Sequence, residues 1–319
     1  MNQLTRLQPD LERALFAEDM IAGLSKTPKA TPPKWFYDAA GSALFGEITR
    51  LPEYYPTRTE MALLAARGGD IARAVGPGRT VVEYGSGSAA KAIALLGALQ
   101  APAGYLCVEI DPGAARATAH EVELAFPDLP VRGVAGDFTH LQGEVTAGSR
   151  PRLGFFPGST IGNFPPEEAG PLLAAMREHL GPGGQLLLGA DLIKDKAILE
   201  AAYDDAAGVT ARFNLNLLQR ANRELGADFD LAGFEHRAIW NDASASIEMH
   251  LVARHDQTVT MDGHRFHFAA GETIHTESSY KFDESRLKSL AYAGGWAIDQ
   301  LWIALEQPFA LALLTADSR

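Results

Sequence analysis

The pattern of apolar and polar positions is most informative between residues 80 and 100. Val81 and Val82 are β-branched and apolar, as a buried parallel strand requires, and they lead into Gly85 and Gly87. Behind the glycines, apolar residues recur at the spacing of one helical face, at Ala89, Ala92, Ile93 and Leu96. The pattern predicts a strand, a tight glycine turn and a helix, which together are typical of a nucleotide-binding unit.

The alternation of strands and helices continues on both sides of this unit. A helix is predicted over 59–75, strands over 105–111, 131–138 and 153–156, and helices over 113–126 and 166–179. A Gly-Pro-Gly-Gly turn at 181–184 leads into a fifth strand, and a helix over 283–294 precedes two closing strands within 297–315. The pattern therefore predicts an α/β fold with a doubly wound parallel sheet.

The remaining segments break this alternation. Helices are predicted over 7–30, 195–203 and 209–225, and strands within 234–282, where Asp262-Gly263 marks a turn. We expect these segments to form a second, α+β domain from residues 1–58 and 197–282. The first domain would then contain residues 59–196 and 283–319.

Residues 34–58 are unusually rich in aromatic side chains and contain Trp35, Phe36, Tyr37, Phe45, Tyr54 and Tyr55. Two interpretations are open for this stretch. It forms an N-terminal cap whose rings fill the core, or a lid whose phenols face a polar ligand. The first is favoured because buried aromatic residues usually pack against apolar neighbours.

Composition narrows the class of protein. The chain has 319 residues, 46% of them hydrophobic, and a formal net charge of −12, which does not fit a nucleic-acid binder. No apolar run reaches membrane-spanning length and no signal peptide is evident, so we expect no membrane partner. The single cysteine, Cys107, lies in an apolar run and is interpreted as a core residue, which fits a cytoplasmic protein with a small-molecule substrate.

The glycine turn favours a particular cofactor. Ala90 stands where a dinucleotide fingerprint has its third glycine, and Glu83 precedes Gly85 by two residues. This pattern suits a cationic ligand without a pyrophosphate, such as S-adenosylmethionine (SAM). At the next strand ends, Glu109 is suited to the ribose hydroxyls, Asp137 to the adenine amino group and Phe138 to stacking on the ring.

The histidines do not indicate a metal site. His264 and His267 are three residues apart on a predicted strand, so they point to opposite faces, and no cysteine or carboxylate cluster accompanies them. Asp191 and Asp195 are better explained as a cap and a surface residue than as a magnesium site. We therefore expect no metal.

Longer motifs identify a family. Residues 33–38, 51–58, 158–163, 203–205, 213–216, 247–249 and 276–282 resemble the histidine Nα-methyltransferases of ergothioneine biosynthesis. The resemblance runs nearly from end to end. It implies a Rossmann-like class I methyltransferase sheet of seven strands with an antiparallel last pair, next to a substrate-binding domain.

The resemblance also implies the reaction and the site. The enzyme would use SAM to methylate the α-amine of L-histidine three times, giving hercynine and S-adenosylhomocysteine, and it would be a monomer. Tyr54, Asn163 and Tyr203 would hold the amino and carboxylate groups, with Tyr54 and Asn163 nearest the chemistry. The imidazole and the pocket would be contacted by Tyr37, Glu277, Ser278, Ser279, Phe45, Gly158 and Met249, and the cofactor by Gly85, Ser86, Gly87, Lys91, Glu109, Asp137 and Phe138.

Some positions depart from the family pattern, and other functions remain open at this point. Tyr84, Pro157 and Tyr280 replace the more usual residues beside the proposed contacts, which puts kinetic parameters in doubt more than substrate identity. The alternatives are a SAM methyltransferase for another amine, an NAD(P)-dependent oxidoreductase and a SAM-binding regulator. For methyl transfer we expect no dedicated general base, and Tyr54 or water would remove the amine proton.

Overall fold

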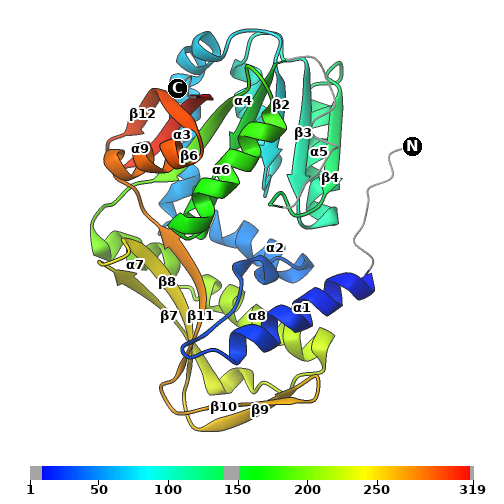
Figure 1. Cartoon of the computed structure of the whole chain (residues 1–319), viewed down its shortest axis with the longest axis vertical. Coiled ribbons are helices and arrows are strands. Elements are labelled where there is room, and N and C mark those ends of the chain that lie inside the picture. Colours follow the sequence, from blue (N-terminus) through cyan, green and yellow to red (C-terminus); the bar gives the residue numbers. More distant parts are fainter. Residues whose placement is uncertain (1–8, 140–150, 317–319) are drawn as a thin grey trace. The chain divides into compact units, whose positions relative to one another are not determined.

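The computed structural model describes residues 9–139 and 151–316 of the chain (Figure 1). The chain forms two compact units. Among the described residues, the first unit contains 55–139, 151–194 and 280–316, and the second contains 9–54 and 195–279. The chain therefore passes from one unit to the other after Tyr54, after Lys194 and after Ser279.

The first unit is built on a seven-stranded sheet with the order β12-β13-β6-β5-β2-β3-β4. Strands β2 to β6 pair in parallel, and β13 pairs antiparallel with both β6 and β12. The predicted α/β sheet with an antiparallel last pair is thus confirmed. The strands are β2 (Thr80–Tyr84), β3 (Gly104–Glu109), β4 (Val131–Ala135), β5 (Arg152–Phe156), β6 (Gln185–Asp191), β12 (Trp296–Ala304) and β13 (Phe309–Ala316).

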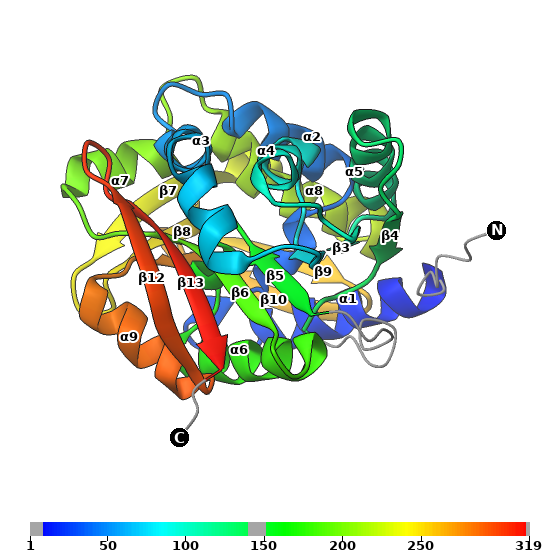
Figure 2. The same ribbon diagram turned by 90° about the horizontal axis from the view of Figure 1, so that it is seen from above.

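Helices cover both faces of this sheet, as Figure 2 shows for α3 and α4 on one side and α6 and α9 on the other. Central strands are buried on both sides, which is why they read as nearly continuous apolar runs. Strand β6, for example, is buried at every position. The helices are α3 (Tyr55–Val75), α4 (Ala89–Ala98), α5 (Pro112–Ala125), α6 (Pro166–Leu180) and α9 (Glu284–Ala293).

The second unit combines helices with two small sheets. Its main sheet has the order β1-β11-β8-β7, and β10 pairs with β9 in a hairpin that turns at Asp262 and Gly263. Lys29 pairs with Ile274, so the N-terminal segment and the later segment share one sheet. The elements are α1 (Pro9–Leu24), β1 (Lys29–Ala30), η1 (Pro33–Phe36), α2 (Ala39–Ile48), α7 (Lys196–Tyr203), α8 (Val209–Leu225), η4 (Leu231–Gly233), β7 (Phe234–Asn241), β8 (Ser246–Ala253), β9 (Gln257–Met261), β10 (His264–Phe268) and β11 (Thr273–Tyr280).

Several boundaries differ from the sequence prediction, and three of these differences bear on the sheets or the site. Helix α1 ends at Leu24 and is followed by the short strand β1, because the chain turns at Thr27-Pro28. Helix α3 begins at Tyr55, four residues early, since a proline such as Pro56 is tolerated in a first helical turn. Strand β4 ends at Ala135, so Asp137 and Phe138 lie in the loop that follows it.

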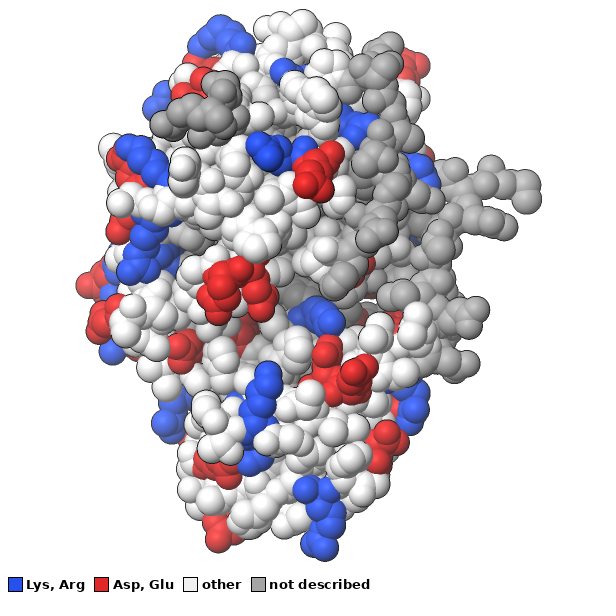
Figure 3. Space-filling view, viewed as in Figure 1, with Lys and Arg blue, Asp and Glu red and all other residues white. Residues whose placement is uncertain are grey.

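The described surface shows no extended basic area on the face that is drawn in Figure 3, in line with the negative net charge. On this face, acidic and basic side chains are interspersed. None of the described helices is both long enough and apolar enough to cross a lipid bilayer.

Candidate active site

The glycine turn after β2 has the backbone geometry that its sequence predicts. Gly85 and Gly87 have φ of 71° and 49°, the left-handed region that favours glycine. A Cβ on Gly85 would lie 3.4 Å from Cε1 of Phe138. A Cβ on Gly87 would meet no atom within 4 Å, so the backbone is open there, and Ser86 lies buried in the turn.

The carboxylate of Glu109 binds this turn from the end of the neighbouring strand β3. Its Oε2 accepts the N–H of Gly87 at 3.1 Å, and its Oε1 accepts the N–H of Ile110 at 2.8 Å. Burial raises the pKa of Glu109, against the lowering effect of these backbone donors. The acid predicted for the ribose thus lies beside the glycine turn, as predicted from the strand order.

The loop after β4 holds the two residues predicted for the adenine. Oδ1 of Asp137 accepts from the backbone N–H of Thr139 at 2.9 Å and from its hydroxyl at 2.6 Å. The ring of Phe138 lies 6.3 Å from that of Tyr84 and 5.5 Å from that of Phe156. Phe138 therefore lies next to the glycine turn, and Asp137 is hydrogen-bonded within its own loop.

Lys91 and Gly158 are joined by a residue that sequence analysis did not single out, Glu60 of α3. The carboxylate of Glu60 is fully buried, and its Oε2 lies 2.6 Å from Nζ of Lys91. It also accepts the N–H of Gly158, at 2.9 Å for Oε2 and 3.1 Å for Oε1. The signal in the sequence was an acid on the apolar face of α3, in register with Leu64 and Ile71.

The segment after β5 contains Asn163, at the end of the short helix η3 (Thr160–Asn163). Gly158 has a φ of 77°, and a Cβ on Gly162 would come within 2.7 Å of the carbonyl oxygen of Tyr280. Ser159, which is buried, accepts the backbone N–H of Asp191 at 2.9 Å. These contacts fix the segment that presents Asn163.

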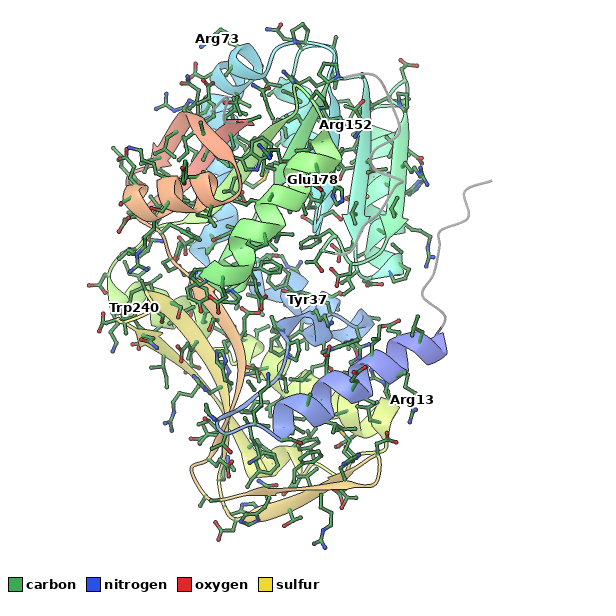
Figure 4. All side chains as sticks on the ribbon, viewed as in Figure 1. Arg13, Tyr37, Arg73, Arg152, Glu178 and Trp240 are labelled. Carbon is green, nitrogen blue, oxygen red and sulfur yellow. The ribbon has the colours of Figure 1, made fainter. Side chains whose placement is uncertain are left out.

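The second unit contains the other residues predicted for the substrate. Four of their rings form one cluster, in which Tyr37 and Phe45 also contact Phe213 of α8, and Figure 4 labels Tyr37. Centroids are 5.7 Å apart for Tyr37 and Phe45, 6.2 Å for Phe45 and Tyr54, and 6.1 Å for Tyr54 and Tyr203.

Some residues of the aromatic stretch are core residues, as the first interpretation expects, and others are only partly buried, as the second interpretation requires. Trp35 and Phe36 are buried core residues, and Nε1 of Trp35 donates to Asp19 at 2.8 Å. Tyr37 and Phe45 are only partly buried. The ring of Phe45 faces Tyr37 and Tyr54 edge-on, so it packs between two phenols that stay candidates for ligand contact.

Strand β11 carries Glu277 and Ser279 on the same face, because side chains two residues apart share one face of a strand. Both are buried, and the hydroxyl of Ser279 accepts from the phenol of Tyr203 at 2.9 Å. Ser278 is hydrogen-bonded to Nε2 of His275 at 2.9 Å. On the adjacent strand β8, the carbonyl of Met249 accepts from the hydroxyl of Thr276 at 2.9 Å.

Sequence analysis also missed His236 on β7, which holds the backbone of Tyr203. Nε2 of His236 donates to the carbonyl of Tyr203 at 2.8 Å, so Nδ1 is free of a proton and accepts from Nδ2 of Asn214 at 2.8 Å. Burial lowers the pKa of His236, which keeps the imidazole neutral. Tyr203 is thus held at its phenol by Ser279 and at its carbonyl by His236.

The predicted site residues are therefore divided between the units. Gly158 and Asn163 lie in the first unit with all the residues predicted for the cofactor, and the remaining substrate residues lie in the second. The described residues include no group of three or more histidine, cysteine, aspartate or glutamate side chains placed to hold a metal ion.

Comparison with known proteins decides between the alternatives left open by the sequence. A model of a family described as histidine-specific, SAM-dependent methyltransferases matches residues 16–316. The chain belongs to this family. Membership in the histidine-specific methyltransferase family gives SAM as the cofactor and excludes an NAD(P)-dependent oxidoreductase.

Individual relatives are similar over most of the chain. A histidine N-alpha-methyltransferase of Mycolicibacterium smegmatis is 45% identical over 294 residues, 90% of this chain and 91% of that protein. One of Mycobacterium tuberculosis is 42% identical over 317 residues, 96% of this chain and 97% of that protein. The ergothioneine biosynthesis protein 1 of Neurospora crassa is 29% identical over 254 residues, 72% of this chain and 28% of that protein.

The residues of the first unit fit the cofactor of this histidine-specific methyltransferase family. The left-handed glycine turn allows close approach of a ligand, and the Glu109 carboxylate at its side suits hydroxyl groups. Lys91 supplies a cation that can meet the carboxylate of SAM, and Phe138 supplies a ring for the adenine. None of these groups needs a metal ion for that task.

Proposed function

We propose that this protein methylates the α-amino nitrogen of L-histidine, up to Nα,Nα,Nα-trimethylhistidine (hercynine), as the first step of ergothioneine biosynthesis. The observation that carries this proposal is the 45% identity, over 90% of the chain, to a protein named histidine N-alpha-methyltransferase. The similarity to an ergothioneine biosynthesis protein supports the pathway. The monomeric state implied by the sequence resemblance is part of the proposal, and light scattering would test it.

In this reaction the protein mainly positions the amine nitrogen of the substrate relative to the methyl group of SAM. SAM, when bound, supplies an electrophilic methyl carbon on a sulfonium. A neutral amine nitrogen must be held about 3 Å from that carbon, in line with the bond that breaks. The α-ammonium of an amino acid must first lose a proton, since its pKa is about 8 or higher. Burial of the amine favours its neutral form, so no strong base is required, and the proton passes to Tyr54 or water.

We assign the predicted residues to three roles. The amino and carboxylate groups of histidine are held by Tyr54, Asn163 and Tyr203, and the Ser279 and His236 contacts that fix Tyr203 support this role. The imidazole and the pocket walls are contacted by Tyr37, Glu277, Ser278, Ser279, Phe45, Gly158 and Met249. The cofactor is contacted by Gly85, Ser86, Gly87, Lys91, Glu109, Asp137 and Phe138. Residues 59–196 and 283–319 are the proposed SAM-binding domain, which also supplies Gly158 and Asn163, and residues 1–58 and 197–282 are the proposed substrate-binding domain.

Glu277 is the proposed basis of selectivity. It is 6% exposed on β11, so its carboxylate is largely removed from water. An imidazole N–H can donate to this carboxylate, whereas an apolar side chain leaves it without that bond, which costs about 1–3 kcal/mol.

Mass spectrometry of the purified protein with SAM and an equimolar mixture of the amino acids tests the proposal. We expect histidine alone to gain one, two and then three methyl groups. Histamine, which lacks the carboxylate, is the control for recognition of the amino-acid part and should react far more slowly. Methylation of a different amino acid would keep SAM as cofactor and overturn the assignment of Glu277.

A further inference from the structure

Glu60 occupies a buried position, where an unpaired carboxylate would destabilise the folded protein. It lies on the apolar face of α3 and is fully buried among groups of the first unit. Removing a carboxylate from water without partners is strongly unfavourable, so such a group is expected only where it is well paired. Glu60 has two partners, the ammonium of Lys91 and the backbone N–H of Gly158.

The surrounding backbone is shaped around this carboxylate. A Cβ on Gly189 of β6 would overlap Oε1 of Glu60, so only glycine fits there. Gly158 has a φ of 77°, and a Cβ on it would lie 3.2 Å from Nζ of Lys91. Gly158, which follows β5, and Gly189 of the neighbouring strand β6 thus make room for one ion pair.

The ion pair leaves Lys91 able to bind a further anion. An ammonium has three N–H donors in a tetrahedral arrangement, and Glu60 takes one of them. The side chain of Lys91 is 12% exposed, so the ammonium is neither fully covered nor free to turn in water. SAM carries a single anionic group, its carboxylate, and charge therefore selects this carboxylate as the group that Lys91 meets.

We propose that Glu60 is a positioning residue, which holds the Lys91 ammonium where it meets the cofactor carboxylate and fixes the Gly158 peptide at the end of β5. This inference rests on the proposed function and extends it. One carboxylate, from a helix that precedes the glycine turn in the chain, would set both the cofactor anchor and the start of the segment that leads to Asn163. Glu60 itself touches neither reactant in this arrangement.

The first test measures binding of S-adenosylhomocysteine by calorimetry, without histidine. Glu60→Gln keeps an oxygen for the Gly158 N–H and removes the charge that holds Lys91. We expect its Kd to rise about tenfold, as for the loss of one charge-assisted contact. Lys91→Met should raise the Kd at least as much, and the double variant should be no weaker than Lys91→Met alone.

A matched control is available on the same helix. Asp70 of α3 forms exposed ion pairs with Arg67 and Arg73, so Asp70→Asn makes the same chemical change at the surface. Its Kd should equal that of the wild type. A Glu60→Gln variant whose Kd lies within twofold of the wild type would overturn the proposal, as would effects of Glu60→Gln and Lys91→Met that simply multiply.

A second test needs no ligand and covers the case in which Glu60→Gln binds nothing. Lys91→Met leaves Glu60 buried without its counter-charge, so we expect its Tm to fall below that of the wild type. Adding Glu60→Gln to Lys91→Met should recover part of the loss. An unchanged Tm in Lys91→Met would show that Glu60 does not depend on the pair and would contradict the proposal.

Steady-state kinetics provides a readout that a purely structural role would not move. In Glu60→Gln the KM for SAM should rise about tenfold, while kcat at saturating SAM and the KM for histidine change less. The failure of the proposed function is distinguishable, because it would appear in the wild type as a lack of histidine methylation. The Tm values of the ligand-free wild type, Lys91→Met and the double variant test the pairing of Glu60 with Lys91 in either case.

Discussion

Selectivity for histidine is expected to depend on Glu277 in the proposed reaction. Replacing Glu277 with alanine removes the acceptor for the imidazole N–H, so the ratio of kcat/KM for histidine to that for phenylalanine should fall about 10- to 100-fold. Competition assays with both amino acids measure this ratio directly. Glu235→Ala on β7, where the carboxylate is exposed, is the control. An unchanged ratio in Glu277→Ala would remove Glu277 from the selectivity argument.

The protonation of Glu83 on β2 links stability to pH. Its side chain is fully buried, Oε2 accepts from the phenol of Tyr105, and Oε1 has no hydrogen-bond partner among the described residues. Burial raises its pKa from 4.5 to about 8. Between these two values the folded protein keeps a proton that the unfolded chain releases, so the stabilising contribution of this proton decreases as pH rises.

Urea unfolding of the ligand-free protein at pH 5 and pH 8 tests this linkage. We expect Glu83→Gln to gain stability relative to the wild type as pH rises from 5 to 8, because the amide has no proton to lose. Glu178→Gln on α6, a carboxylate on the exposed side of the helix (Figure 4), should follow the wild type. Parallel pH profiles for Glu83→Gln and the wild type would contradict a raised pKa.

At the scale of elements, Asp38 begins α2 and connects it to α8. Oδ1 of Asp38 accepts the N–H of Gly41 at 2.7 Å and Nδ2 of Asn216 at 2.8 Å, and Oδ2 accepts from Arg223 at 2.5 Å. Burial by itself would raise the pKa of Asp38, but these donors together lower it. Helix α2 carries Phe45, so this cap also supports the aromatic cluster.

Two variants separate the cap of α2 from the ion pair. Asp38→Ala should cost about 1–2 kcal/mol of unfolding free energy at pH 7, and Asp38→Asn less, since asparagine still caps a helix. Because the pKa of Asp38 is lowered in the folded state, its contribution is present above pH 3.8 and is lost as pH falls further. Urea unfolding at pH 7 and pH 3 measures both effects. Equal losses at the two pH values would contradict the charged role of Asp38.

Helices and strands with a regular pattern of apolar residues were predictable from the sequence. Elements that form through contacts between distant segments were not. The strands of the first unit are apolar runs and its helices have a regular apolar face, so only their ends were misplaced. The pairing of β1 with β11 joins Lys29 to Ile274 and has no local pattern. The two-residue strand β1 forms only because β11 offers it a partner.

The same distinction applies to the site. Gly85, Gly87 and Glu109 were predicted because the strand order places their ends together, and the geometry of the turn confirms their closeness. Glu60 and His236 contact other side chains and backbone groups of the protein, and the residues around them in the sequence form no recognisable motif. Glu60 could have been recognised as an acid at an apolar position of a helix. An acid on the buried face of a helix requires a buried partner for its charge.

At the scale of the whole chain, Asp191 at the end of β6 collects contacts from distant segments of the first unit. Tyr55 donates to Oδ2 at 2.5 Å, Lys281 lies 3.1 Å from Oδ2, and Lys194 pairs with Oδ1. Asp191 and Lys281 are fully buried, so the interpretation of Asp191 as a cap or surface residue was wrong, whereas Asp195 caps α7. Burial lowers the pKa of Lys194 to about 8, in spite of the opposite effect of Asp191.

Removing this carboxylate should be among the most destabilising changes in the protein. Asp191→Asn leaves two buried ammonium groups with no counter-charge at Asp191, so we expect a loss of about 3–5 kcal/mol at pH 7. The loss should shrink at pH 9.5, where a lysine with a lowered pKa releases its proton in the folded state. Urea unfolding at both pH values measures it. Adding Lys281→Met should recover part of the loss, and a loss independent of pH would contradict the charge argument.

Within the described residues, Tyr55 and Lys194 stand where the chain enters and leaves the first unit, and Lys281 is the second residue after it returns. Residues 195–279 are therefore inserted between two lysines that hold the same aspartate. A segment whose ends meet at one anchored point can be lengthened, shortened or exchanged without altering the register of the strands it interrupts. In the proposed assignment, residues 195–279 carry Tyr203, Met249 and Glu277, so chimaeras joined at these lysines would exchange these substrate contacts while Tyr54 and Asn163 stay in place.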